Sequence, residues 1–176
     1  MGNDLDTHTS EQPFENEIRL KALSCSQIKL HINLHGYPSH EWVRPFSGYI
    51  PKGFEKWTLP KGFFLILRYA DDEIYQTCGR ELLCQLTKRL SNIPQLCTFN
   101  KRQLEQVSMH VGENDLKVLN NIPCIITKVS KSMVPLQLIS EFPDETLYGE
   151  HFQFAHTVQK MVVLEAYNIY QALNVP

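Results

Sequence analysis

The sequence predicts an α/β fold, because short apolar runs of strand character alternate with amphipathic helical stretches along its 176 residues. Hydrophobic residues make up 43 % of the chain and charged residues 20 %, which is typical of a globular chain with a core of its own. We expect a three-layer α/β/α arrangement around a mixed sheet, whose strands include residues 28–35, 63–69, 124–129 and 136–141.

The chain begins with a polar segment, residues 1–13, which we expect to be flexible. A helix is predicted over residues 14–25, and the first strand follows directly. Apolar and polar residues alternate in that strand with the two-residue period of a sheet. The polar set, His31, Asn33 and His35, is therefore expected on one face of the sheet.

Residues 36–62 are rich in proline and glycine, which excludes a long helix and predicts an extended loop. Its aromatic side chains either pack on the core or line a substrate pocket. Beyond the second strand, Asp71 or Asp72 is expected to cap a helix that reaches about Ile93 and ends before Pro94. Two further helices are predicted, at residues 102–109 and 152–173.

The composition argues against two classes of binding partner, nucleic acids and membranes. The net charge is −2, and there is no cluster of Lys and Arg of the kind that binds nucleic acid. No apolar run approaches the ~20 residues of a membrane span, and the N-terminus does not resemble a signal peptide, so we expect a cytoplasmic protein that binds no membrane. The five cysteines lack C-x-x-C spacing and are expected to be reduced, partly buried thiols.

Two of the predicted strands have an ionisable side chain at their carboxyl end. One ends at His35, where the chain turns at Gly36 and Pro38, and the other ends at Glu141. Open α/β sheets place their sites at such strand ends. Taken alone, a histidine there is more often structural and a glutamate more often a surface residue. Together, an imidazole ligand and a carboxylate base suggest metal-assisted hydrolysis.

Three motifs extend this pattern: His35-Gly-Tyr37, then Pro45-Phe-Ser-Gly48-Tyr49, and later Glu141-Phe-Pro-Asp144-Glu-Thr-Leu-Tyr148-Gly149. In this order they resemble the C-terminal portion of a zinc carboxypeptidase catalytic domain of the carboxypeptidase A type. That family has a strand ending in His-Ser-Tyr, then Pro-x-Gly-Tyr, and later Glu-Leu-Arg-Asp-x-Gly-x-Tyr-Gly-Phe. The segment Ser10-Glu11-Gln-Pro-Phe-Glu15 is similar to the stretch that opens the family's helix before the histidine strand.

The resemblance implies roles for two residues. His35 would be a zinc ligand, Glu141 the general base, and the activity would be release of a C-terminal amino acid from a peptide by attack of a zinc-bound water. Related amidases and deacylases use the same ligands on small N-acyl substrates, which is the main alternative. A non-catalytic remnant or interaction subunit is the other.

The sequence also departs from the family. In the family, the other two zinc ligands lie upstream in a His-x-x-Glu motif, and an Asn-Arg pair after it binds the substrate's terminal carboxylate. We expect the residues before Ser10 of this chain to supply neither. The family's mobile tyrosine has no counterpart between Tyr75 and Tyr148. Residues 14–176 are therefore expected to be the C-terminal part of such a domain, inactive alone, with an incomplete sheet whose exposed face promotes self-association.

Overall fold

The computed structural model describes Lys21, Ser24 and residues 28–37, 43–44, 57–58, 62–111, 117–130, 134–143 and 149–173. Side chains are described throughout these ranges except at 43–44, 57–58 and 106–111. The segment 1–13 and most of the helix predicted at 14–25 lie outside the described residues.

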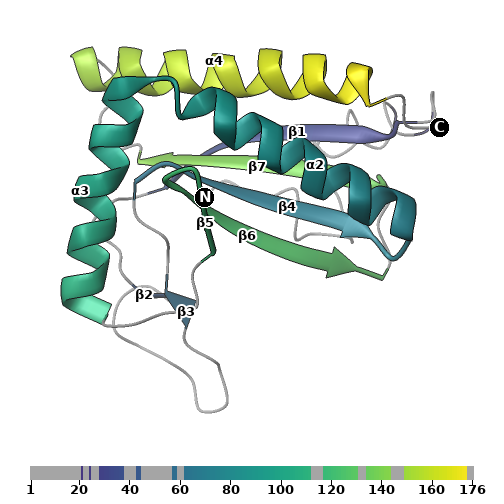
Figure 1. Cartoon of the computed structure of the whole chain (residues 1–176), viewed down its shortest axis with the longest axis horizontal. Coiled ribbons are helices and arrows are strands. Elements are labelled where there is room, and N and C mark those ends of the chain that lie inside the picture. Colours follow the sequence, from purple (N-terminus) through teal and green to yellow (C-terminus); the bar gives the residue numbers. More distant parts are fainter. Residues whose placement is uncertain are drawn as a thin grey trace.

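Five strands form one mixed sheet, which confirms the predicted α/β class (Figure 1). In spatial order they are β1 (Leu30–Tyr37), β7 (Leu136–Pro143), β4 (Phe64–Ala70), β6 (Ile122–Val129) and β5 (Lys117–Leu119). β1 runs parallel to β7 and β4 parallel to β6, whereas β4 is antiparallel to β7 and β5 is antiparallel to β6. Four of the strands cover the four ranges predicted from sequence, with ends displaced by up to two residues.

The short strand β5 was not predicted. It is joined to β6 by the pair Asn120-Asn121, whose φ angles are 49° and 65°. Positive φ at both central residues defines a two-residue hairpin turn that matches the twist of the flanking strands, and asparagine tolerates it. The Asn-Asn pair is the sequence signal for this hairpin.

The helices whose bounds lie within the described residues are α2, α3 and α4. α2 (Glu73–Leu90) begins as predicted, because Oδ1 of Asp72 accepts a hydrogen bond from the Ile74 amide at 2.8 Å. α3 (Pro94–Val111) begins well before the predicted residue 102, and Pro94 opens it rather than merely following α2. Proline suits a first helical position because the amide it lacks has no partner there. α4 is Gly149–Ala172.

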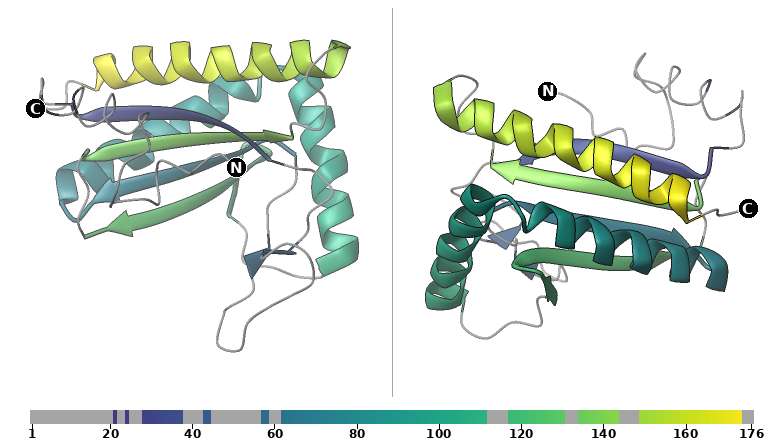
Figure 2. Two further views of the ribbon diagram at one scale, coloured as in Figure 1. Left: turned by 180° about the vertical axis from the view of Figure 1, so that it is seen from behind. Right: turned by 45° about the horizontal axis from the view of Figure 1, so that its top comes forward.

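Helices α2 and α4 lie side by side over one face of the sheet, and α3 stands at the end where β7 finishes (Figures 1 and 2). The core lies between this face and the two helices. Its buried side chains include Leu65, Leu67, Leu136 and Leu138 from the sheet, Leu82, Leu83 and Leu86 from α2, and Val158, Val162 and Ile169 from α4. Of the helices whose bounds are described, α2 and α4 cover this face, and the second helical layer stays an expectation.

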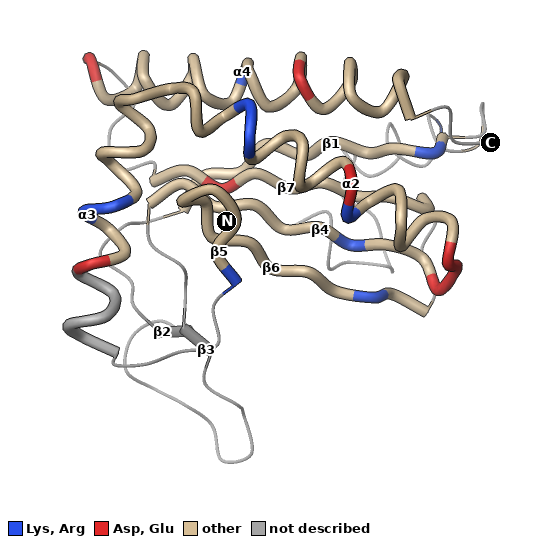
Figure 3. Tube along the Cα trace, viewed as in Figure 1, with Lys and Arg blue, Asp and Glu red and all other residues tan. Residues whose placement is uncertain are grey.

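The opposite face of the sheet carries the polar side chains of β1, as the alternation predicted. His31 and His35 are paired in register with Gln137 and Glu141 of β7. Arg68 of β4 continues the first of these rows, and its Nη1 donates to Oε1 of Gln137 at 3.3 Å. Charged residues are otherwise spread over helices and strand ends, with no continuous basic stripe among the described residues (Figure 3).

The proline-rich segment 36–62 contains a second, two-stranded antiparallel sheet. It is formed by β2 (Val43–Arg44) and β3 (Trp57–Thr58). The aromatic side chains expected to pack or to line a pocket in this segment lie, apart from Tyr37, outside the described side chains.

Candidate functional site

His35 and Glu141 meet at the carboxyl ends of β1 and β7. The parallel register places them directly opposite each other, and opposed residues of neighbouring strands project from the same face of a sheet. Nδ1 of His35 lies 3.4 Å from Oε1 of Glu141. The expected placement at neighbouring strand ends is therefore confirmed, while the roles of metal ligand and base stay predictions.

The carboxylate of Glu141 is buried, with 8 % of the residue exposed. Its second oxygen, Oε2, is buried and has no hydrogen-bond partner among the described residues. Leaving a buried acceptor unsatisfied costs about 1–3 kcal/mol, and more for a charged group. Phe64 of β4, the neighbour of Glu141 across the sheet, is also buried and offers no compensating donor. The fold therefore keeps one carboxylate oxygen of Glu141 buried and without a hydrogen-bond donor among the described residues.

The His35 ring is held from its other side by Asn33, two residues earlier on the same face. Nδ2 of Asn33 lies 2.8 Å from Nε2 of His35. With the amide as donor, Nε2 accepts and the ring proton is on Nδ1, which faces Glu141. One third of the His35 side chain is exposed, so the ring is accessible while Glu141 is shielded.

Hydrogen bonds of the Tyr37 and Asn100 side chains fix the backbone next to the His35–Glu141 pair. We call this set of bonds the brace; the sequence did not predict it. The Tyr37 hydroxyl donates to the Gly62 carbonyl at 2.7 Å, and the fully buried Asn100 of α3 bonds both the amide and the carbonyl of Phe63. A third hydrogen bond, donated by Nδ2 of Asn100, reaches the carbonyl of Asn121 at 3.2 Å. The end of β1, the entry to β4 and the β5–β6 hairpin are thereby fixed to α3.

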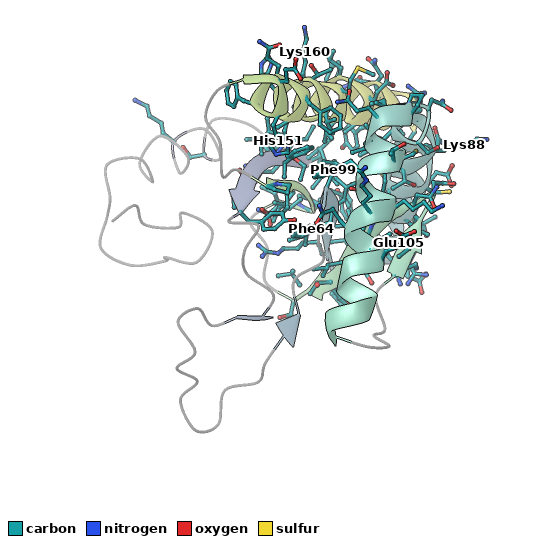
Figure 4. The ribbon with its side chains drawn as sticks, turned by 90° about the vertical axis from the view of Figure 1, so that its left-hand side faces the viewer. Phe64, Lys88, Phe99, Glu105, His151 and Lys160 are labelled. Carbon is teal, nitrogen blue, oxygen red and sulfur yellow. The ribbon has the colours of Figure 1, made fainter. Side chains whose placement is uncertain are left out.

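An aromatic cluster lies on the helix-covered side of the same strand end. Phe142 stacks on Phe99 of α3 at 5.5 Å between ring centroids, and both rings contact His151 and Phe154 of α4. Two members of the cluster, Phe99 and His151, are labelled in Figure 4. A hollow of about 510 Å³ between α3 and α4 is lined by Phe99, His151 and Phe154. Since Phe142 and Glu141 point to opposite faces, this hollow is not on the face of the His35–Glu141 pair.

The pair matches the donor types of a zinc site but not the number of ligands. A catalytic zinc ion is held by three protein ligands with one position left for water. Within the described residues, no group of three or more His, Cys, Asp or Glu side chains is close enough to hold a metal ion. His35 is thus the one described residue to which the resemblance assigns zinc.

One His-x-x-Glu spacing occurs upstream of β1, His8-Thr-Ser-Glu11, and it overlaps the segment that resembles the family's helix-opening stretch. These residues lie outside the described residues, as do Asp144 and Tyr148 of the third motif. The last residue of that motif, Gly149, is described and begins α4.

Comparison of the chain with models of known protein families, with curated proteins and with solved structures gave no match. The family resemblance therefore depends on the motifs quoted above. Within the described residues, no helix is long and apolar enough to cross a membrane.

Proposed function

We propose that this chain carries part of the site of a zinc hydrolase of the carboxypeptidase type, with His35 as a metal ligand and Glu141 as the proton acceptor. The observation that supports the proposal best is the buried Oε2 of Glu141, which lacks a partner among the described residues. It belongs to a carboxylate that contacts an accessible imidazole at neighbouring strand ends. A catalytic base requires this combination of proximity and a free oxygen.

In the proposed reaction, Glu141 takes a proton from the attacking water through Oε2, because Oε1 is the oxygen that faces His35. It then returns the proton to the leaving nitrogen of the cleaved amide. Zinc bound at His35 would supply a Lewis acid that makes water acidic and polarises the carbonyl group. Burial keeps the carboxylate away from bulk water, which strengthens its interaction with the transferred proton.

Asn33 suits both states of the His35 ring. A histidine that ligates a metal through one nitrogen carries a proton on the other and donates it to a fixed acceptor. The Asn33 side chain has a donor and an acceptor on one planar group. In the present arrangement it donates to Nε2. After a half-turn of the amide its oxygen would accept from a protonated Nε2, and Nδ1 would be the nitrogen that binds the metal.

The same pair would serve an amidase or deacylase that acts on a small N-acyl substrate. The two activities differ in how the substrate is recognised, and the described residues include no part assigned to that step. A panel of N-blocked dipeptides and N-acyl amino acids, assayed by release of free amine, distinguishes them.

The proposal is tested on the longest product of the gene that contains residues 1–176. Glu141→Gln is expected to keep its zinc content and lose about 10²–10⁴-fold in turnover, because only the proton acceptor is removed. Glu105→Gln, an exposed glutamate on α3, is the matched control and should leave turnover unchanged. Near-normal turnover in Glu141→Gln, or zinc content unaffected by His35→Ala, would overturn the assignment.

A further inference from the structure

A glutamine on α4 bonds to both strands that carry the proposed site. Nε2 of Gln159 donates to the backbone carbonyl of His35 at 3.0 Å. Its Oε1 accepts a hydrogen bond from the hydroxyl of Ser140, the residue before Glu141. Both ends of one side-chain amide are thus used, one on β1 and the other on β7.

The register explains why these two bonds affect the pair. Ser140 lies opposite Leu34, one step before the His35–Glu141 level, and it is fully buried on the helix-covered face. Glu141 projects from the other face, so Gln159 contacts neither of the facing side chains. It holds the backbone on either side of them: the carbonyl of His35 itself and the residue that precedes Glu141.

Within the described sheet, β1 is paired with a neighbouring strand on one side. β7 is the one described strand that pairs with β1, and α4 packs over β7. A bond from α4 to the His35 carbonyl therefore fixes the strand that presents the imidazole. To bond both strands, a side chain on α4 must be long enough to reach them and must carry both a hydrogen-bond donor and an acceptor. The side-chain amide of glutamine supplies both in a neutral group.

We propose that Gln159 is a positioning residue, which sets the separation and orientation of the His35 ring relative to the Glu141 carboxylate. Its importance for catalysis rests on the proposed function, but its effect on the geometry of the pair does not. Gln159 touches none of the reacting atoms, so it acts only through the two strands.

Three substitutions separate the two bonds. Gln159→Met keeps the length of the side chain and removes both bonds. Gln159→Glu keeps an acceptor for Ser140 and removes the donor to His35. Ser140→Ala removes the other bond and leaves Gln159 in place. Gln171→Met, at an exposed position of the same helix, is the matched control.

The test is nitrogen NMR of the imidazole rings in histidine-labelled protein at pH 8, with the His35 signals assigned by their loss in His35→Gln. In the native chain we expect two separate ring signals, one for a protonated Nδ1 and one for an unprotonated Nε2. Gln159→Met should move both signals toward a common averaged position, and Gln159→Glu and Ser140→Ala should produce smaller shifts in the same direction. Gln171→Met should leave them unchanged.

Thermal unfolding followed in parallel separates positioning from simple support of the fold. A folded Gln159→Met protein whose melting temperature falls while the His35 signals stay in place would overturn the proposal. So would unchanged His35 signals in Gln159→Glu and Ser140→Ala, which each retain one of the bonds. Neither measurement requires zinc or substrate, so the proposal can succeed or fail whatever the turnover of Glu141→Gln.

Discussion

Nδ1 of His35 lies 3.4 Å from Oε1 of Glu141, although the two residues belong to strands at opposite ends of the described chain. The contact exists because β1 and β7 are parallel neighbours in a register that sets these residues side by side. A slip of one residue would send Glu141 to the helix-covered face, because side chains alternate along a strand. The candidate site therefore forms only when β1 and β7 pair in this register.

The first prediction concerns the stability of a chain without the Glu141 charge. Glu141→Gln should leave the free energy of unfolding within about 1 kcal/mol of the native value or raise it, since it removes a buried charge with an unsatisfied oxygen. A glutamate whose main role was a buried ion pair would instead cost about 3–5 kcal/mol when one partner is lost. Urea unfolding measures the difference.

Glu165→Gln is the control for this experiment. Glu165 forms an ion pair with Arg89 between α4 and α2, and both side chains are more exposed than Glu141. Its replacement is expected to change stability by less than about 1 kcal/mol, as is usual for surface pairs. A loss of several kcal/mol in Glu141→Gln alone would show that the carboxylate is structural.

The second prediction concerns zinc. The chain of 176 residues should bind zinc weakly and without fixed stoichiometry, because a single imidazole lacks the set of ligands that gives zinc sites their affinity. Competition with a chromogenic chelator measures this. Tight one-to-one binding that disappears in both His35→Ala and His8→Ala would show that the chain supplies its own His-x-x-Glu ligands, and that the expectation of a missing upstream half is wrong.

Local patterns were sufficient to predict most of the fold. The alternation in β1, the apolar runs of β4, β6 and β7, and the Asp72 cap are each properties of a few consecutive residues. Pro94 was interpreted as a helix end because proline has the same preference for the start of the next helix. Sequence alone does not separate these two uses.

The geometry of the candidate site could be predicted only in part. Strand ends identified His35 and Glu141, but their partners depend on pairing between distant segments. Asn33 reaches Nε2 of His35 only when both project from one strand face, and Gln159 reaches β1 and β7 only because α4 packs across them. The free oxygen of Glu141 is likewise a property of its burial, which no local pattern encodes.

The third prediction tests the brace beside the site. Gly62 has a φ of +78°, and a Cβ atom there would lie 2.6 Å from Oδ1 of Asn100. Gly62→Ala should therefore combine left-handed backbone strain with a clash that disturbs the hydrogen bond donated by the Phe63 amide to Oδ1 of Asn100, at a cost of at least about 2 kcal/mol.

Gly149→Ala provides the comparison for Gly62→Ala. Gly149 has a similar φ of +83°, but an added Cβ would meet nothing within 4 Å. Only the backbone strain remains, so the loss should be about 1 kcal/mol. Chemical unfolding of both variants gives the two values. Equal losses would show that Asn100 yields easily and that the brace contributes little.

The fourth prediction concerns the thiols, which are free at the four described cysteines. Burial raises the pKa of Cys124 from 9.0 to about 12. In the native protein Cys124 should therefore resist alkylation at pH 8 while the exposed Cys84 reacts, as measured by mass spectrometry of the labelled peptides. Rapid labelling of Cys124 under native conditions would contradict its burial in the core.

The same shift makes stability depend on pH in a defined direction. Because the folded pKa of Cys124 lies above the unfolded value, the folded state holds the proton more tightly. Its contribution is fully present below pH 9 and is lost as the pH rises from 9 toward 12. Because a serine hydroxyl does not ionise in this pH range, the Cys124→Ser variant should show a smaller fall in the free energy of unfolding over the same range.

The last prediction concerns the edge of the sheet at β1. No described strand pairs with its outer side, and Leu34 on this strand is 46 % exposed. An exposed apolar side chain on such a strand favours association with a further copy of the chain. We expect the average mass in solution, measured by light scattering, to rise with protein concentration.

Leu34→Lys should lower this average mass toward that of the monomer, since a charged side chain on an edge strand opposes pairing. Leu164→Lys, at a similarly exposed leucine of α4, should not. A monomeric native chain at every concentration tested would show that this edge does not mediate association.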